Sequence, residues 1–465
     1  MSRYISTRGE TPSQTFADVL LAGLAPDGGL FLPETWPQVG KQEIAGFATK
    51  PYGEVAYAIL KRFAGESFSD DELKADIAAA YAGFDDPAVA PLSEIGSGLY
   101  LLELFHGPTL AFKDIALQIL GRLFARALKK RGGRATVVAA TSGDTGSAAI
   151  AALGGLENIE LFVLHPKGRV SEVQRLQMTT SPHSNVHNIA LEGTFDDAQA
   201  IVKALFADRK FAQKTFLTAV NSINFARIAA QTVYYFTAAA QLGAAPTFVV
   251  PTGNFGDVFA GEAAMRMGLS IEKLVVATNA NDIMARALNE GVYAAGTAQP
   301  TLSPSMDIQV ASNFERALFE ASGRDAAWLR EAMAIFAREK KLTLPQNLRA
   351  ALSARYGARA CGDDRTLAAI AALHQIDGRL IDPHTAVALA VAEEVQSGAK
   401  GPVVVLATAH PAKFADAVRR ATGAEPALPP QLKGLYEGVE RASVLGHDQA
   451  LVRDFILERS AAHGH

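Results

Sequence analysis

Short apolar runs rich in β-branched residues alternate with helical stretches from residue 96 onward. They lie at 136–140, 161–164, 186–191, 247–250, 274–277 and 403–406. Strands of this kind, separated by helices of ten or more residues, predict parallel βαβ units and therefore an α/β fold. Ligands in open α/β sheets bind outside the carboxyl ends of the strands, so the loops that follow these runs are the first candidates for a site.

The first part of the chain has a different texture. Residues 1–95 combine short helical patterns with turns, and helices are predicted over 54–63 and 70–81. Because 465 residues exceed what one hydrophobic core usually holds, we expect several domains and assign 1–95 to a small N-terminal one. Toward the other end, residues 322–367 are rich in Ala, Arg and Glu and are predicted to be mostly helical.

Composition limits the partners and the compartment. The 44 basic and 48 acidic residues give a net charge of −4, which argues against nucleic acid as a partner. No apolar run is long enough to span a bilayer, and the first residues lack the apolar segment of a secretory signal. Cys361 is the single cysteine, so no internal disulfide is possible. We therefore expect a cytoplasmic protein that binds neither membranes nor nucleic acid.

A lysine stands where a rigid turn becomes a helix. The stretch 106–114 reads His-Gly-Pro-Thr-Leu-Ala-Phe-Lys-Asp, and the apolar residues after it recur at helical spacing. A helix N-terminus and apolar neighbours such as Phe112 both favour a neutral amine at Lys113. A neutral buried lysine is a nucleophile that typically forms a Schiff base with a carbonyl. The alternative for one lysine taken alone is a solvated surface charge.

Two loops after strands are rich in backbone donors. The loop 141–147, Thr-Ser-Gly-Asp-Thr-Gly-Ser, offers hydroxyls and N–H groups at a helix start, which suits a carboxylate; a well-capped helix is the alternative. The loop 251–257, Pro-Thr-Gly-Asn-Phe-Gly-Asp, can form a nest of N–H groups for a phosphate; a tight turn is the alternative. It matches neither the Walker A nor the dinucleotide-binding pattern.

Two further segments carry polar groups. Residues 221–227, Asn-Ser-Ile-Asn-Phe-Ala-Arg, suit a second oxyanion, with Arg227 as its bidentate partner; a capped helix with a solvated arginine is the alternative. Thr408 and His410 follow the strand at 403–406, where a ligand contact would lie, although a loop histidine with internal partners is commoner. His183 and His187 are four apart, but their surroundings do not favour a helix, so no metal site is expected.

Taken together, these motifs resemble threonine synthase, a family of fold-type II pyridoxal-phosphate enzymes. The resemblance extends over nearly the whole chain. It includes Tyr-Ile-Ser-Thr-Arg-Gly at 4–9, Pro-Ser-Met-Asp-Ile at 304–308, Ser-Asn-Phe-Glu-Arg at 312–316 and Thr-Ala-His-Pro-Ala-Lys-Phe at 408–414. It implies two layered α/β domains that enclose the cofactor, besides the N-terminal one. We assign 96–134 with 221–465 to the larger, cofactor-binding domain and 135–220 to the smaller.

The resemblance also implies a role for each motif. Lys113 would form the Schiff base with pyridoxal 5′-phosphate and then transfer protons, and Thr408 would contact the pyridine nitrogen. The cofactor would be held by the loop after the strand at 247–250: Gly253, Asn254, Phe255, Gly256 and Asp257. The substrate carboxylate and the cofactor's hydroxyl face would meet Ser142, Gly143, Asp144 and Thr145. The substrate phosphate would meet Asn221, Ser222 and Arg227.

The implied reaction converts O-phospho-L-homoserine and water to L-threonine and phosphate, by γ-elimination followed by addition of water at Cβ. The protein would thus be a carbon–oxygen lyase acting on phosphate, whose partner is this small-molecule substrate, and a monomer or homodimer. Cofactor and substrate each bring a phosphate, which matches two separate oxyanion loops. A related lyase that releases a 2-oxo acid, and a non-catalytic protein that binds pyridoxal phosphate or another phosphometabolite, remain alternatives.

Overall fold

The computed structural model describes residues 2–218 and 220–461. Its larger sheet has the strand order β13–β10–β9–β14–β4–β3. β3 pairs antiparallel with β4, whereas the other neighbours are parallel. In that order the strands are Tyr356–Ala360, Lys273–Thr278, Thr247–Pro251, Val403–Ala407, Leu99–Glu103 and Leu92–Gly96. The predicted strands at 247–250, 274–277 and 403–406 are confirmed.

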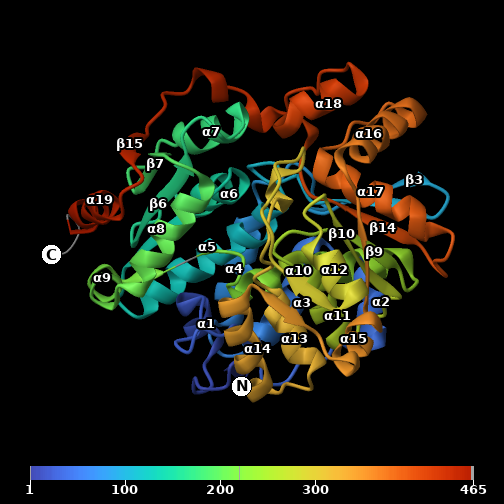
Figure 1. Cartoon of the computed structure of the whole chain (residues 1–465), viewed down its shortest axis with the longest axis horizontal. Helices are drawn as coiled ribbons and strands as arrows, with labels where there is room; N and C mark the ends of the chain where they lie inside the picture. The colour runs from blue at the N-terminus through green and yellow to red at the C-terminus, as the bar shows by residue number, and fades with distance from the viewer. Residues whose placement is uncertain (1, 219, 462–465) are drawn as a thin grey trace.

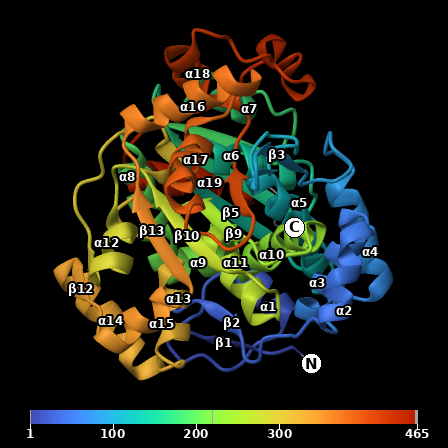
Figure 2. The same ribbon diagram turned by 90° about the vertical axis from the view of Figure 1, so that its right-hand side faces the viewer.

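Helices cover both faces of this sheet, which explains why its strands are continuous apolar runs. Along β14, Val403 and Val405 pack with one set of helices, and Val404 and Leu406 pack with the other. The first set is α16 (Asp363–Asp377) and α17 (Pro383–Gln396); the second includes α5 (Lys113–Lys130), α10 (Phe225–Leu242) and α11 (Gly256–Arg266). Figure 2 shows β9 and β10 enclosed between helices. The sheet is therefore a buried centre layer.

The smaller sheet has the order β15–β7–β6–β5–β8, and all its pairs are parallel. The strands are Ser443–Gly446, Val186–Glu192, Ile159–Pro166, Ala135–Ala140 and Leu217–Thr218. Its helices are α6 (Asp144–Leu153), α7 (Glu172–Thr179), α8 (Phe195–Ala207), α9 (Arg209–Thr215) and α19 (Gln449–Ala461). Figure 1 shows this layer on the left, beside the larger sheet and its helices. An α/β protein with two layered sheets is thereby confirmed.

The C-terminal segment crosses from one sheet to the other. After α18 (Ala415–Thr422) the chain passes along the top of the molecule in Figure 1, and β15 pairs with β7. Our division placed all of 221–465 in the larger domain, whereas β15 and α19 belong to the smaller sheet. The four residues of β15, Ser-Val-Leu-Gly, are too few to predict the strand with which they pair.

The N-terminal region packs directly on the larger layer. Its elements are β1 (Tyr4–Ser6), α1 (Phe16–Ala22), β2 (Phe31–Pro33), α2 (Lys41–Gly46), η1 (Phe47–Thr49), α3 (Tyr52–Ala64) and α4 (Asp70–Tyr81). α4 has the predicted bounds, because Ser69 and Glu72 form a capping box at its start. Buried residues of these elements form one continuous cluster with α5 and α10. The region therefore shares a core with the rest of the chain.

The remaining elements lie outside these two sheets. They are α12 (Ile283–Glu290), β11 (Val292–Ala294), η2 (Pro304–Met306), α13 (Phe314–Ala321), α14 (Ala326–Glu339), β12 (Lys341–Thr343), α15 (Gln346–Ser353), η3 (Pro411–Phe414), η4 (Pro430–Leu432) and η5 (Leu435–Glu437). The stretch 322–367 is thus mostly helical, but it also contains β12 and β13. Within 2–218 and 220–461, no helix is long and apolar enough to cross a membrane.

Candidate active site

Lys113 is the first residue of α5, at the end of a loop that is fixed from within. Asp114 accepts hydrogen bonds from the backbone N–H and the hydroxyl of Thr109, at 2.8 and 2.7 Å. A Cβ on Gly107 would lie 2.5 Å from the Cβ of Asp114, so a side chain there would displace this contact. Leu110 is buried with a φ of 62°, a strained conformation for a non-glycine residue. These contacts account for the spacing of the motif at 106–114.

The loop after β14 lies directly beside this segment. The N–H of Phe112 donates to the carbonyl of Thr408 at 2.9 Å, and the N–H of His410 donates to the carbonyl of Leu110 at 3.0 Å. The structure therefore brings Thr408 next to Lys113, and among the described residues the Thr408 hydroxyl has no hydrogen-bond partner. His410 accepts from the N–H of Ala412 through Nδ1, so this histidine caps η3 within its own loop.

The amine of Lys113 is almost completely enclosed. The residue is 8% exposed, and its Nζ lies 4.8 Å from the ring centre of Phe112 and 3.2 Å from Oδ2 of Asp144. Burial lowers the pKa of Lys113; Asp144 opposes this, whereas the positive charges of Lys413 and Arg227 lower the pKa further. A lowered pKa favours the neutral, nucleophilic amine.

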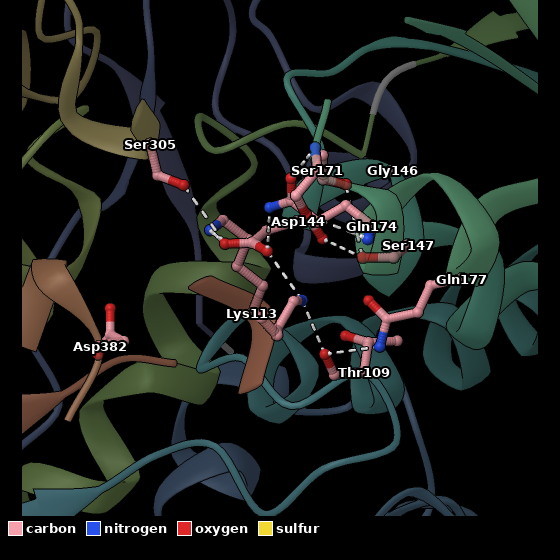
Figure 3. Close-up of polar contacts among 12 residues, drawn as sticks. Thr109, Lys113, Asp144, Gly146, Ser147, Ser171, Gln174, Gln177, Ser305 and Asp382 are labelled. Carbon is pink, nitrogen blue, oxygen red and sulfur yellow. Dashed lines mark hydrogen bonds and ion pairs between the residues drawn. The ribbon is translucent and has the colours of Figure 1, made fainter. Parts of the chain in front are cut away.

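Asp144 begins α6 and is surrounded by donors (Figure 3). Its Oδ1 accepts from Lys413 at 2.8 Å and from Gln174 at 2.9 Å, and its Oδ2 accepts from Lys113 and, at 3.3 Å, from Ser305. Burial raises the pKa of Asp144, but the two lysines and Gln174 outweigh it and hold the pKa well below its usual value. The Asp144 carboxylate is therefore ionised and lies at ion-pair distance from both lysines.

The rest of this loop still offers free donors. Among the described residues, the N–H groups of Ser142, Asp144 and Thr145 and the two hydroxyls have no hydrogen-bond partner. Gly143 has a φ of 143°, and a Cβ there would lie 2.3 Å from the Gln174 side chain. Only glycine fits at this position, and it lets the loop turn its N–H groups outward. An anion such as a carboxylate suits these groups.

The loop after β9 has an even larger set of free donors. No described residue accepts a hydrogen bond from the N–H groups of 253–257, the loop and first residues of α11. Phe255 has a φ of 64°, so the backbone here curves as an anion-binding nest does. The carboxyl of Asp257 accepts from the hydroxyls of Tyr234 and Tyr235, at 2.5 and 3.1 Å. Asp257 therefore offers this loop its N–H, while its carboxyl is held by the tyrosines.

Arg227 lies in the first turn of α10 and is buried. The residue is 4% exposed, and its buried Nε and Nη1 have no hydrogen-bond partner among the described residues. Burial lowers its pKa to about 10. The last few residues before it are fixed, because Asn224 caps α10 and donates to the carbonyl of Leu20 at 2.9 Å. A buried, unpaired guanidinium is costly unless an anion joins it.

Asn313 ties these two donor sets together. Its Nδ2 donates to the carbonyl of Asn254 at 3.0 Å and to that of Ser222 at 3.2 Å. The fully buried Arg316 in turn donates to Asn313 and to the carbonyls of Ile223 and Phe31. Asn221 is exposed, and its Oδ1 accepts from the N–H of Ile223 at 3.2 Å. The segments 221–227 and 253–257 are therefore neighbours, and Asn313 holds their backbones at a fixed distance from each other.

Sequence reasoning missed several groups of this site. Gln174, Lys413 and Ser305 all contact Asp144, yet none was singled out. Sequence reasoning also gave no separate indication of Asp382, His384 and Thr385. Asp382 accepts from the ring Nδ1 of His384 and from the N–H of Thr385, and the Nε2 of His384 accepts from the N–H of Ser305 at 3.2 Å. Ser305 and Lys413 lie in the family motifs at 304–308 and 408–414, whereas Gln174 and residues 382–385 lie outside them.

His106, at the start of the Lys113 loop, provides a pH-dependent test of this architecture. Burial lowers its pKa, but hydrogen bonds to Glu103 and Asp85 outweigh it and raise the pKa above its ordinary value. The protonated His106 ring contributes its full share to the free energy of unfolding below the unfolded-state pKa near 6.5. This contribution is lost as the pH rises through the folded-state pKa of His106. We expect His106→Gln to lower the free energy of unfolding by about 1 kcal/mol at pH 6 and by clearly less at pH 9.

Urea unfolding at both pH values measures this difference. Asp85→Asn, which removes one of the two carboxylates, should give a smaller effect with the same pH dependence. An equal loss at pH 6 and pH 9 would show that His106 acts through packing alone.

Family models match this chain in three successive segments. The model for the threonine synthase N terminus matches residues 3–81, that for pyridoxal-phosphate dependent enzymes matches 87–354, and that for the threonine synthase C-terminal region matches 385–456. This chain belongs to the threonine synthase family. A threonine synthase of Pseudomonas aeruginosa is 49% identical over 460 residues, which are 98% of each chain.

Solved threonine synthases have the same fold over the whole length. The PLP-bound threonine synthase from Brucella melitensis has a TM-score of 0.96 and 49% identity, covering 99% of this chain and 100% of that one. The yeast threonine synthase has a TM-score of 0.94 and 37% identity, covering 99% of each chain. The resemblance to threonine synthase and the fold-type II architecture are therefore confirmed.

Proposed function

We infer that this chain converts O-phospho-L-homoserine and water to L-threonine and phosphate with pyridoxal 5′-phosphate as cofactor. One observation carries the inference beyond family membership. Lys113 is enclosed and its pKa is lowered, and two separate groups of hydrogen-bond donors near it could each bind an anion. They are the N–H groups of 253–257 and the guanidinium of Arg227, and the described residues offer these groups no acceptor. A phosphorylated cofactor and a phosphorylated substrate together supply one anion for each group.

The residues fit the cofactor. Lys113 is the amine that would bind its aldehyde, the N–H groups of Gly253, Asn254, Phe255, Gly256 and Asp257 would hold its phosphate, and the unpaired hydroxyl of Thr408 would meet the ring nitrogen. When bound, the cofactor withdraws electrons from the amino acid, so that protons on Cα and Cβ become removable. Lys113 is the group placed to take and return them.

Two other segments would bind the substrate. The free N–H groups and hydroxyls of Ser142 and Thr145, with Gly143 shaping the loop, would bind the substrate carboxylate. Asn221, Ser222 and Arg227 would bind the substrate phosphate. Asp144 differs from its expected role: as an anion held by two lysines it cannot bind a carboxylate, and we assign to it the electrostatic control of Lys113. We propose a cytoplasmic location, in keeping with the free, buried Cys361.

The test is to incubate the purified protein with O-phospho-L-homoserine and to identify the organic product by NMR while phosphate release is followed. L-Threonine in equal amount with phosphate is the expected result. A 2-oxo acid in that amount would instead identify a phospho-lyase without water addition. Absence of phosphate release from cofactor-loaded protein would identify a binding protein.

Gly253→Ala tests the cofactor-phosphate loop. A Cβ at this position would lie 2.9 Å from the backbone carbonyl oxygen of Ser305, so the loop must shift and its N–H groups must turn. Losing one charge-assisted contact costs about 1.5–3 kcal/mol, so we expect cofactor affinity to fall about tenfold to a hundredfold. Absorbance titration of the cofactor-free protein measures this affinity. Gly83→Ala, at a position with open space, is the matched control, and equal affinities in the two variants would contradict the assignment.

A further inference from the structure

Two buried lysines face one carboxylate in this site. The Nζ of Lys413 lies 2.8 Å from Oδ1 of Asp144, and the Nζ of Lys113 lies 3.2 Å from Oδ2 (Figure 3 shows Asp144 and Lys113). Lys413 comes from η3 in the loop after β14, whereas Asp144 begins α6 on the smaller sheet. The contact therefore joins the two layers beside the cofactor-binding lysine.

The surroundings decide which lysine holds the proton. The Lys413 side chain is 0% exposed, and its Nζ also donates to the carbonyl of Thr109 at 2.8 Å. Lys113 has the longer contact and retains some exposure. One buried carboxylate balances one buried ammonium; a second ammonium would be uncompensated. Lys413, with two acceptors at short range, is the better ion partner of Asp144.

The other charged groups near Lys113 do not change this balance. Arg227 adds a further positive charge, which disfavours a second ammonium. The carboxyl of Asp257 is held by two tyrosines, and that of Asp114 is held by Thr109. The charge of Asp257 acts on Lys113 from a distance, but among the described residues neither acid forms a hydrogen bond or an ion pair with the Lys113 amine. Asp144 is thus the anion that both lysines share.

We propose that Lys413 is a positioning residue that acts through Asp144: its ion pair with Asp144 keeps that carboxylate ionised and leaves Lys113 as a neutral amine. The proposal rests on the proposed function, in which Lys113 binds the cofactor aldehyde. It also explains why Asp144 is not left as an unpaired buried anion once Lys113 is covalently occupied, because Lys413 remains. The two lysines therefore have different roles: Lys413 supplies charge and Lys113 supplies the reactive nitrogen.

The experiment measures the protonation of Lys113 in the cofactor-free protein. Trace labelling with acetic anhydride between pH 6 and pH 11, followed by peptide mass spectrometry, gives the pH at which half of Lys113 reacts. In Lys413→Met this midpoint should rise by at least about one pH unit, which is a tenfold smaller amine fraction below it. Lys413→Arg, which keeps the charge, should restore the parent midpoint. Lys433→Met, at an exposed lysine, is the control and should leave the midpoint unchanged.

An unchanged or lowered midpoint in folded Lys413→Met would overturn the proposal, as would Lys413→Arg behaving like Lys413→Met. Should Lys413→Met not fold, as judged by circular dichroism, Lys413→Gln keeps a donor for Thr109 without the charge and carries the same expectation. Because no substrate or cofactor is present, the result does not depend on whether the chain produces threonine. Failure of the proposed function and failure of this inference are therefore separable.

Discussion

Lys113→Ala is expected to remove covalent cofactor binding and to lower the turnover of O-phospho-L-homoserine by at least about 10²- to 10⁴-fold, the usual effect of losing a proton-transferring group. The loss should be large because no neighbouring amine can replace it. The Nζ of Lys413 is fully buried and engaged by Asp144 and Thr109, both at 2.8 Å. Turnover assays measure the rate, and borohydride reduction followed by peptide mass spectrometry identifies the lysine that carries the cofactor.

The label should lie on Lys113 in the parent protein and be missing in the variant. Lys433→Ala, at an exposed position, is the control for general effects of lysine removal and should be labelled normally. A label found on Lys413 in the parent protein would exchange the roles of the two lysines. It would also refute the division of charge and reactivity that we propose for them.

Replacing Arg227 should change activity and stability in opposite directions. We expect Arg227→Met to lower kcat/KM for O-phospho-L-homoserine about tenfold to a hundredfold, because a charge-assisted contact contributes about 1.5–3 kcal/mol. The buried Nε and Nη1 of the same guanidinium have no acceptor in the part of the chain that the structure describes. Its removal should therefore raise the free energy of unfolding, as replacement of buried charges by apolar groups often does. Steady-state kinetics and urea unfolding give the two quantities.

Arg316→Met is the matched control, because Arg316 is equally buried but donates to Asn313 and to the carbonyls of Ile223 and Phe31. Arg316→Met should lower the free energy of unfolding, whereas Arg227→Met should raise it. Cofactor affinity should stay near the parent value in Arg227→Met, since the cofactor phosphate uses residues 253–257. Equal damage to phosphorylated and unphosphorylated amino-acid substrates would show that Arg227 serves only the structure.

Local signals were sufficient for much of the fold. Helix α4 has its predicted bounds because Ser69 and Glu72 define its start, and Thr194 with Asp197 does the same for α8. Strand β13, in contrast, has the sequence Tyr-Gly-Ala-Arg-Ala, which lacks β-branched residues. It forms a strand because its backbone pairs with the edge of β10. Helix α6 begins at Asp144, within the loop 141–147, since the glycine-rich loop itself supplies the first turn.

The candidate site divides in the same way. Some groups belong to motifs that can be recognised in the sequence, and these groups lie together in the structure. They are Lys113, the N–H donors of 253–257 and Thr408. Lys413 could not, because one lysine in a loop gives no hint that its amine is buried against a carboxylate on another sheet. The same holds for Gln174, whose capping role in α7 conceals its contact with Asp144.

The return of the C-terminal segment to the smaller sheet affects how the protein can be made. β15 pairs with β7, and Val452 and Ile456 of α19 complete the apolar cluster over Phe162 and Leu191. At about 5–20 residues per second, translation needs roughly 10–50 s to proceed from β7 to β15. Throughout that interval β7 is an open edge and this cluster lacks its cover. The smaller sheet therefore cannot be completed until β15 has been synthesised, and the edge of β7 is open to wrong pairing until then.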